Sequence, residues 1–193
     1  MESIARRPVR RIVTADGPDG LSLALSDAAV DDVLRDPARP GFQSTRVWAT
    51  DRTPAVALTA EAVARLPGLI EPPPGGALFR IVTIPPDAVW DPHVSPEAAH
   101  AFFKAAAAGH AWCGAGSRHL YMQQSCTLEL CVVLEGELVL VLDLAEVALR
   151  AGDTVVQRGT RHAWSNRSGR PAVLAVSSHD GERTSHQPDS ELD

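Results

Sequence analysis

The chain has 193 residues, of which 45% are hydrophobic and 22% are charged, a composition typical of one globular domain. Its formal net charge of −6 argues against a nucleic-acid partner, since phosphate binding needs a concentrated basic surface. No apolar run approaches the roughly 20 residues of a membrane span, and the N-terminus lacks the apolar core of a secretory signal, so we expect a cytoplasmic protein.

The N-terminal quarter predicts short strands separated by turns. Residues 8–14 and 21–25 are predicted strands, and the Asp- and Gly-rich segment 16–20 between them is dense in turn residues. The polar, proline-interrupted segment 31–41 is predicted to be a loop. Residues 42–50 are the next predicted strand.

The following segment combines a rigid connector with helices. A short helix is predicted over 60–66, a proline-rich connector over 71–76 and a strand over 77–84. The clearest helix is predicted over 96–108, because Ser95 is a good N-cap residue and Gly109 can end the helix. We expect it to pack on the rest of the fold or to cover part of it.

The C-terminal half changes in character. It contains four apolar runs, at 127–134, 137–143, 147–156 and 171–177. Short strands at this spacing, with glycine-containing turns between them, indicate a sandwich or a barrel. The polar tail 181–193 is predicted to be disordered.

The first of these strands has two chemically different faces. Its odd positions carry Gln123, Ser125, Thr127, Glu129 and Cys131, whereas its even positions become steadily more apolar. Side chains alternate between the two faces of a strand, so the polar set lies on one side. Periodicity alone favours a polar face in water, and a polar face lining a ligand cavity inside a barrel is the functional alternative.

Two motifs resemble those of the cupin superfamily. Val-Val-Leu-Glu-Gly-Glu-Leu at 132–138 and Gly-Asp-Thr-Val-Val-Gln-Arg-Gly-Thr-Arg-His-Ala-Trp-Ser-Asn at 152–166 are similar to its two conserved motifs. Residues 47–51 and 75–82 resemble the lead-in of a subgroup of small single-domain (type-2) cupins. The resemblance implies an all-β, double-stranded β-helix or jelly-roll barrel with an internal site.

On this resemblance the whole chain is one cupin domain. Residues 1–117 supply N-terminal strands, the connector and a helix that pack on the barrel, and 118–180 form the barrel core. The tail at 181–193 follows it.

The resemblance also implies where a metal site would lie. Cupins usually place two histidines and a carboxylate on the first motif and a third histidine on the second, and the matching positions here are Gln123, Ser125, Glu129 and His162. Amide and hydroxyl oxygens are weak ligands for transition metals, so we expect no tightly bound metal and no other cofactor. If a divalent metal is bound, its ligands are predicted to be Glu129, His162 and His119.

Glu129 and His162 are the predicted catalytic residues. A partly buried carboxyl can act as a general acid or base near neutrality, and an imidazole can be its partner in proton transfer. The alternatives are a Glu129 satisfied by Arg80 or a backbone donor, and a His162 hydrogen-bonded in the core. The predicted substrate-binding residues are Gln123, Ser125, Thr127, Cys131, Trp164 and Tyr121. Trp164 as a core residue and Cys131 as a small hydrophobe remain alternatives, and the other two cysteines, at 113 and 126, are expected to be reduced thiols.

Three functions follow from this site. The first is an enzyme of secondary metabolism that uses acid–base chemistry without a metal, such as a cyclase, dehydratase or isomerase of an apolar, polyketide-like intermediate. The second is a metal-dependent cupin, such as a dioxygenase, with an unusual ligand set. The third is a non-catalytic binder of a small molecule.

A homodimer is the expected assembly. The outward set Leu128, Leu130 and Val132 and the apolar run 138–142 both need covering. A small-molecule substrate is expected, and neither nucleic acid nor membrane is an expected partner.

Overall fold

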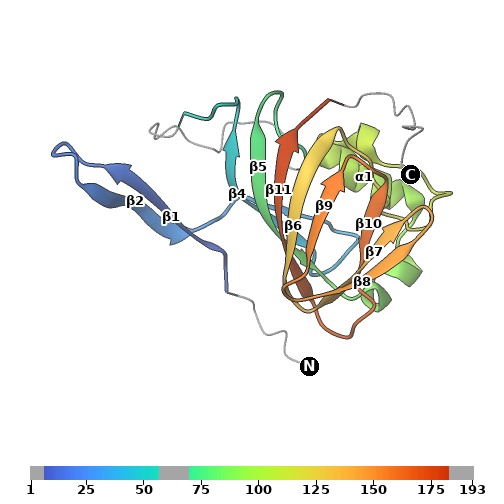
Figure 1. Ribbon diagram of the computed structural model, residues 1–193. Coiled ribbons are helices and arrows are strands. Elements are labelled where there is room, and N and C mark those ends of the chain that lie inside the picture. The colour runs from blue at the N-terminus through green and yellow to red at the C-terminus, as the bar shows by residue number, and fades with distance from the viewer. Residues whose placement is uncertain (1–6, 57–69, 183–193) are drawn as a thin grey trace, which may run out of the picture.

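A computed structural model describes residues 7–56 and 70–182. Two β-sheets face each other as a barrel, which confirms the predicted all-β, jelly-roll class (Figure 1). The larger sheet has the strand order β3-β4-β5-β11-β6-β9, and the smaller has the order β10-β7-β8. The strands of the larger sheet are β3 (Val33–Arg35), β4 (Gln43–Thr50), β5 (Ala77–Ile84), β11 (Ala172–Asp180), β6 (Thr127–Glu135) and β9 (Thr154–Arg158). Those of the smaller are β10 (His162–Ser165), β7 (Glu137–Leu142) and β8 (Glu146–Arg150).

Strand β6 places its odd-numbered residues inside the barrel. From Thr127 to Val133 the odd positions are buried and the even positions are exposed, which confirms the predicted orientation. The alternation does not extend back to residue 122 as predicted. Met122 is fully buried with Val141 and Ala163, because 122–126 leave the regular strand and only Gln123 keeps bridge pairing.

Three element assignments from the sequence are wrong. The run 147–156 is not one strand: Gly152, with φ of +96°, turns the chain so that β8 and β9 enter different sheets. Strand β10 lies in the segment 157–170, between the last two predicted apolar runs, where no strand was predicted. Strand β3 lies inside the predicted loop 31–41. Both are short, and each forms because a neighbouring strand, β7 or β4, offers its backbone hydrogen bonds.

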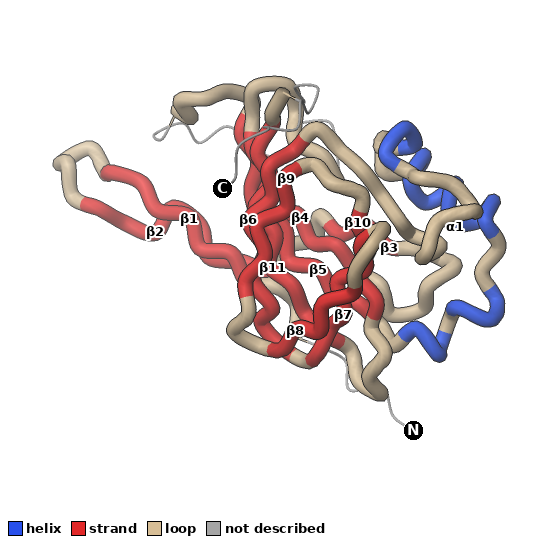
Figure 2. The backbone as a smooth tube through the Cα atoms, turned by 45° about the vertical axis from the view of Figure 1, so that its right-hand side comes forward, coloured by secondary structure: helices blue, strands red, loops and turns tan. Residues whose placement is uncertain are grey.

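The predicted helix is present as α1 (Pro96–Ala105) and begins at Ser95, whose side chain accepts a hydrogen bond from Ala98 N–H. It ends before the predicted Gly109, because Ala107 adopts the left-handed conformation with φ of +57°. The Ala108 N–H donates to Phe103 O, which closes the turn as in a Schellman motif. Figure 2 shows the helical segments gathered on one side of the barrel. Phe102 and Phe103 of α1 enter the main core.

The first two strands form a hairpin that projects away from the barrel (Figures 1 and 2). Strand β1 (Arg10–Asp16) pairs with β2 (Ser22–Ala29), and all eight residues of β2 are exposed. The turn lies in the predicted segment 16–20, where Gly17 N–H donates to Leu21 O. Arg11 of β1 donates to Val47 O on β4, so the base of the hairpin contacts the barrel, whereas β2 does not pack on it as expected for residues 1–117.

Two predicted features fall outside the described residues, namely the helix over 60–66 and all but the first two residues of the tail 181–193. In the described parts of the chain, no helix combines the length and the apolar character that a membrane span requires.

Candidate functional site

Polar residues inside the larger sheet cluster on neighbouring strands. Glu129 on β6 lies directly opposite Ser178 on β11 and Gln157 on β9. Arg80 on β5 faces inward one row away, opposite Val176. The antiparallel register therefore brings together side chains that are up to 98 positions apart in sequence.

Glu129 is held by two neighbours. Ser178 Oγ donates to Glu129 Oε1 at 2.8 Å, and the Arg80 guanidinium forms an ion pair with the same oxygen at 3.3 Å. Both charged side chains are buried, at 6% and 8% exposure. The alternative that Arg80 partners the Glu129 carboxylate is thus observed. Both contacts involve Oε1, and the other oxygen, Oε2, lies nearer to the imidazole of His162.

His162 lies beside that second oxygen. Its Nε2 is 3.7 Å from Glu129 Oε2 and 3.3 Å from Gln123 Nε2, and its Nδ1 donates to Thr160 O at 3.0 Å. Because a carbonyl can only accept, Nδ1 carries the proton, and Nε2 of the neutral ring accepts from the Gln123 amide. Burial lowers the pKa of His162, although the nearby Glu129 charge opposes this.

A small cavity of about 60 Å³ adjoins this cluster inside the barrel. We refer to it as the interior cavity. Its apolar walls are Phe42, Val82, Ile84, Phe102, Phe103 and Leu174. Its polar side chains are Arg39, Ser44, Arg80, Tyr121, Gln123 and Glu129. The cavity is therefore lined by both polar and apolar side chains.

The structure corrects the role predicted for His162. Among the described residues, Glu129, Gln123 and Trp164 line the interior cavity, whereas His162 does not. The imidazole lies behind Glu129 and Gln123 with 1% of its surface exposed. It is thus placed to orient these two side chains rather than to touch a ligand.

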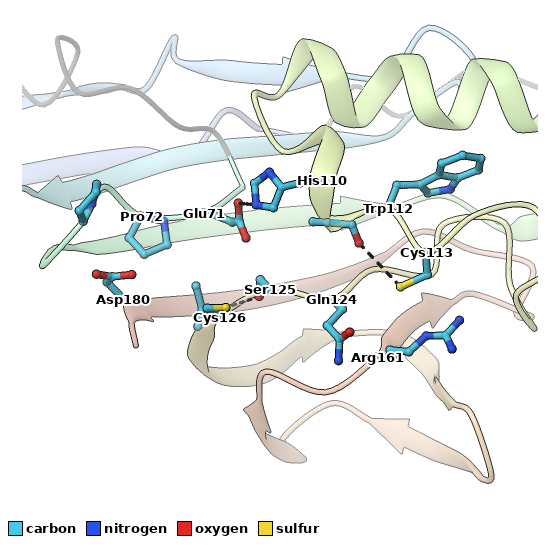
Figure 3. Close-up of a pocket in the computed structure, with 13 residues that line it drawn as sticks. Glu71, Pro72, His110, Trp112, Cys113, Gln124, Ser125, Cys126, Arg161 and Asp180 are labelled. Carbon is cyan, nitrogen blue, oxygen red and sulfur yellow. Dashed lines mark hydrogen bonds and ion pairs between the residues drawn. The ribbon is translucent and has the colours of Figure 1, made fainter. Parts of the chain in front are cut away.

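A second, larger hollow of about 620 Å³ opens at the end of the barrel where β6 begins and β11 ends (Figure 3). We call it the mouth depression. Ser125 and Thr127 line it and not the interior cavity, and their hydroxyls are 2.6 Å apart. Thr127 shares the inward face of β6 with Glu129, but Glu129 lies one inward position deeper and lines the interior cavity instead.

An ion pair closes one side of the mouth depression. His110 Nε2 is 2.8 Å from Glu71 Oε2, and Figure 3 shows these side chains pointing toward each other. Burial raises the pKa of the Glu71 carboxyl, and the neighbouring His110 partly offsets this. The pair joins the connector before β5 to the segment after α1.

The remaining predicted residues divide between wall and core. Trp164 and Tyr121, two of the predicted substrate-binding residues, both line the interior cavity. Cys131 is buried in the main core beneath Glu129, and burial raises the pKa of its thiol to about 12. It contacts neither hollow, so its interpretation as a small hydrophobe fits better than a ligand contact.

The metal site implied by the resemblance does not fit these side chains. His119 packs against the rings of Trp90 and Tyr121 and accepts a hydrogen bond from Tyr121 N–H through Nδ1. It does not join Glu129 and His162, since no three His, Cys, Asp or Glu side chains among the described residues are grouped to hold an ion. Two protein ligands, one of them engaged by Arg80, make a poor site for a transition metal.

Sequence reasoning missed the second buried arginine of the cavity. Arg39 pairs with Asp36 at 2.8 Å, and its guanidinium lies 3.5 Å from the centre of the Tyr121 ring and 3.9 Å from that of Phe42. It comes from the segment predicted as a loop, which gave no periodicity to mark it. The spacing of three residues between Asp36 and Arg39 was the one sequence feature that could have indicated this ion pair.

Comparisons with known proteins agree with this architecture. A family model described as "Cupin domain" matches residues 114–178. Two curated fungal proteins, Phomopsin biosynthesis cluster proteins C' and D of Diaporthe leptostromiformis, are each 50% identical over 48 residues, which is 24% of this chain and 25% of each relative. The match thus spans about a quarter of the length of these relatives.

Two solved structures resemble this chain at low sequence identity. A Cupin 2 conserved barrel domain protein from Salinispora arenicola is 16% identical, with 82% of this chain and 91% of that chain covered and a TM-score of 0.41. A sugar phosphate isomerase from the cupin superfamily of Silicibacter pomeroyi is 18% identical, with 92% and 72% covered and a TM-score of 0.37.

Proposed function

We propose that this chain, of which residues 114–178 form a cupin domain, is an enzyme that moves protons on a small, oxygenated and largely apolar molecule. The reaction class is that of a cyclase, dehydratase or isomerase. The observation that carries the proposal is a buried carboxylate, Glu129, bordering an enclosed cavity whose other walls are mostly apolar. A role in secondary metabolism is supported by the similarity to two proteins of a fungal biosynthesis cluster.

Glu129 is the catalytic residue in this proposal. Ser178 and Arg80 engage Oε1, so Oε2 is the oxygen left for a proton from the substrate. Removing the proton from a carbon next to a carbonyl gives an enolate and a neutral Glu129. Returning the proton to a different carbon gives an isomer, and returning it to a departing hydroxyl group gives water and a dehydrated product.

His162 is a positioning residue. Its Nδ1–H is fixed by Thr160 O, so Nε2 presents a lone pair to the Gln123 amide. The neutral ring also lies 3.7 Å from Glu129 Oε2, so it limits the positions that the carboxylate can take.

The test is hydrogen exchange at carbon, which needs no knowledge of the natural substrate. The protein is incubated in D₂O with a panel of small 1,3-dicarbonyl and β-hydroxyketone compounds, and deuterium incorporation is followed by NMR. We expect at least one compound to exchange faster than with an equal amount of the Glu129→Gln variant. Equal rates for both proteins across the panel would contradict the proposal.

A non-catalytic ligand binder is the second candidate. The observation in its favour is the pairing of Glu129 with Arg80, which satisfies the carboxylate without any reaction. Saturable binding of a panel compound without exchange at carbon in the same experiment would favour this candidate over the enzyme.

A further inference from the structure

Three buried polar atoms without partners in the described part of the chain belong to side chains that line the interior cavity. Among the buried side-chain atoms of the described residues, Ser44 Oγ, Arg80 Nε and Tyr121 Oη have no hydrogen-bond partner. The three residues are 4%, 6% and 5% exposed, and all three line the interior cavity. Burying a polar group without a partner is unfavourable, so three such groups on one cavity point to a partner that meets them in the working protein.

The three atoms come from adjacent structural elements. Ser44 on β4 pairs with Val82 on β5, and Arg80 is two residues further along β5 on the same inward face. Tyr121 comes from the segment before β6, and Arg39 stacks on its ring. Asp36 lies near enough to help burial raise the pKa of the Tyr121 hydroxyl, yet no group meets this hydroxyl in hydrogen-bonding geometry.

The chemistry of these atoms specifies the partner. A guanidinium N–H can only donate, and both hydroxyls can donate, so the complement is a group with several acceptor lone pairs. Arg80 and Arg39 both line the cavity, and each is already paired with one carboxylate, Glu129 or Asp36. A carboxylate offers two oxygens with about four lone-pair positions, which suits arginine geometry.

The cavity also limits the size of the group. One water needs about 10–15 Å³ on the same measure, so about 60 Å³ accommodates on the order of four to six non-hydrogen atoms.

We infer that the interior cavity binds the carboxylate end of a short-chain organic acid through Arg80 Nε, Ser44 Oγ and Tyr121 Oη. The inference rests on the proposed function, in that it names the substrate class of the same cavity. The carboxylate accepts hydrogen bonds from these three groups, and the short apolar body of the acid lies against Val82, Phe102 and Phe103.

The experiment compares isobutyrate with isobutyramide, which have the same shape and six non-hydrogen atoms each. Binding is measured by calorimetry and by the NMR signals of arginine Nε–H groups. We expect isobutyrate to bind at least ten-fold more tightly and to shift the Arg80 Nε–H signal. Equal affinity for the two compounds, or binding of isobutyrate without a shift of the Arg80 signal, would overturn the inference.

Variants assign the contact to individual atoms. Ser44→Ala and Tyr121→Phe should each weaken isobutyrate binding about five-fold, since each removes one hydroxyl donor. Ser177→Ala is the matched control, because Ser177 is also on a strand of the larger sheet, is absent from the cavity wall and bonds His179 instead. It should bind isobutyrate like the unaltered protein. Unchanged affinity in both Ser44→Ala and Tyr121→Phe would overturn the inference.

The two proposals fail separately. Glu129→Gln should lose exchange at carbon, whereas the binding test compares isobutyrate with isobutyramide on the unaltered protein. Selective carboxylate binding without exchange by any panel compound would leave this inference standing and contradict the proposed enzyme. Exchange at carbon of a panel compound, together with equal binding of isobutyrate and isobutyramide, would support the proposed enzyme and overturn this inference.

Discussion

Ser178 and Glu129 face each other directly across strands β11 and β6, and the Ser178 hydroxyl donates to Glu129 Oε1 at 2.8 Å. This contact, with the Arg80 ion pair on the same oxygen, fixes which carboxylate oxygen is engaged. The chemical difference between the two oxygens of Glu129 is therefore a consequence of strand register.

Replacing Glu129 by Gln should abolish proton transfer while the barrel stays folded. General-base catalysis contributes about 10²–10⁴-fold, so exchange at carbon should fall by at least about 100-fold. The amide has nearly the same shape and can still accept from Ser178. Glu137→Gln is the control, because Glu137 is exposed on β7. A Glu129→Gln protein with more than half of the original exchange rate would exclude Glu129 as the base.

The Arg80–Glu129 pair should show strong energetic coupling. Breaking a buried ion pair by removing one partner typically costs about 3–5 kcal/mol, because the remaining charge is left without compensation. Arg80→Met and Glu129→Met should each lower the free energy of unfolding by about this amount. The double variant should lose much less than the sum, as measured by urea denaturation. Additive losses would show that the two charges are not coupled.

His162 should make the protein less stable in mild acid. Burial holds its folded-state pKa below the ordinary value of about 6.5 that it regains on unfolding. As the pH falls below that value, the unfolded chain binds a proton that the folded protein does not, so stability decreases. The His162→Gln variant should lose up to about 1.4 kcal/mol per pH unit of this dependence in urea denaturation between pH 7 and 5. An unchanged slope would mean that the folded state takes up the proton equally well.

The outer face of the larger sheet should mediate a homodimer. Leu130 and Val156 are cross-strand neighbours that are 47% and 60% exposed, and Leu128 and Leu134 extend the same apolar strip along β6. Light scattering should give about twice the chain mass of 20.5 kDa. Leu130→Lys should shift the protein to the monomer, and Leu144→Lys, at a loop position that is 98% exposed, should not. A monomeric unaltered protein would contradict this prediction.

Local sequence was sufficient to predict those features of the fold that depend on a single local rule, such as strand alternation or helix capping. The alternation in 127–133 predicted which β6 side chains are buried, because side-chain direction along a strand has a fixed period of two. Ser95 predicted the start of α1 through its capping hydroxyl. The apolar run at residues 77–84 coincides with the bounds of β5.

Only the tertiary structure decided which of these side chains share a site. Register across β5, β11 and β6 placed Arg80 and Ser178 on Glu129, and pairing between β10 and β7 set His162 behind the cavity wall instead of in it. Ser44 had no distinguishing signal in the sequence, because its lack of a partner is a property of the packed interior. Sequence periodicity reports which face a residue occupies, whereas contacts between distant strands depend on how the sheets pair and close.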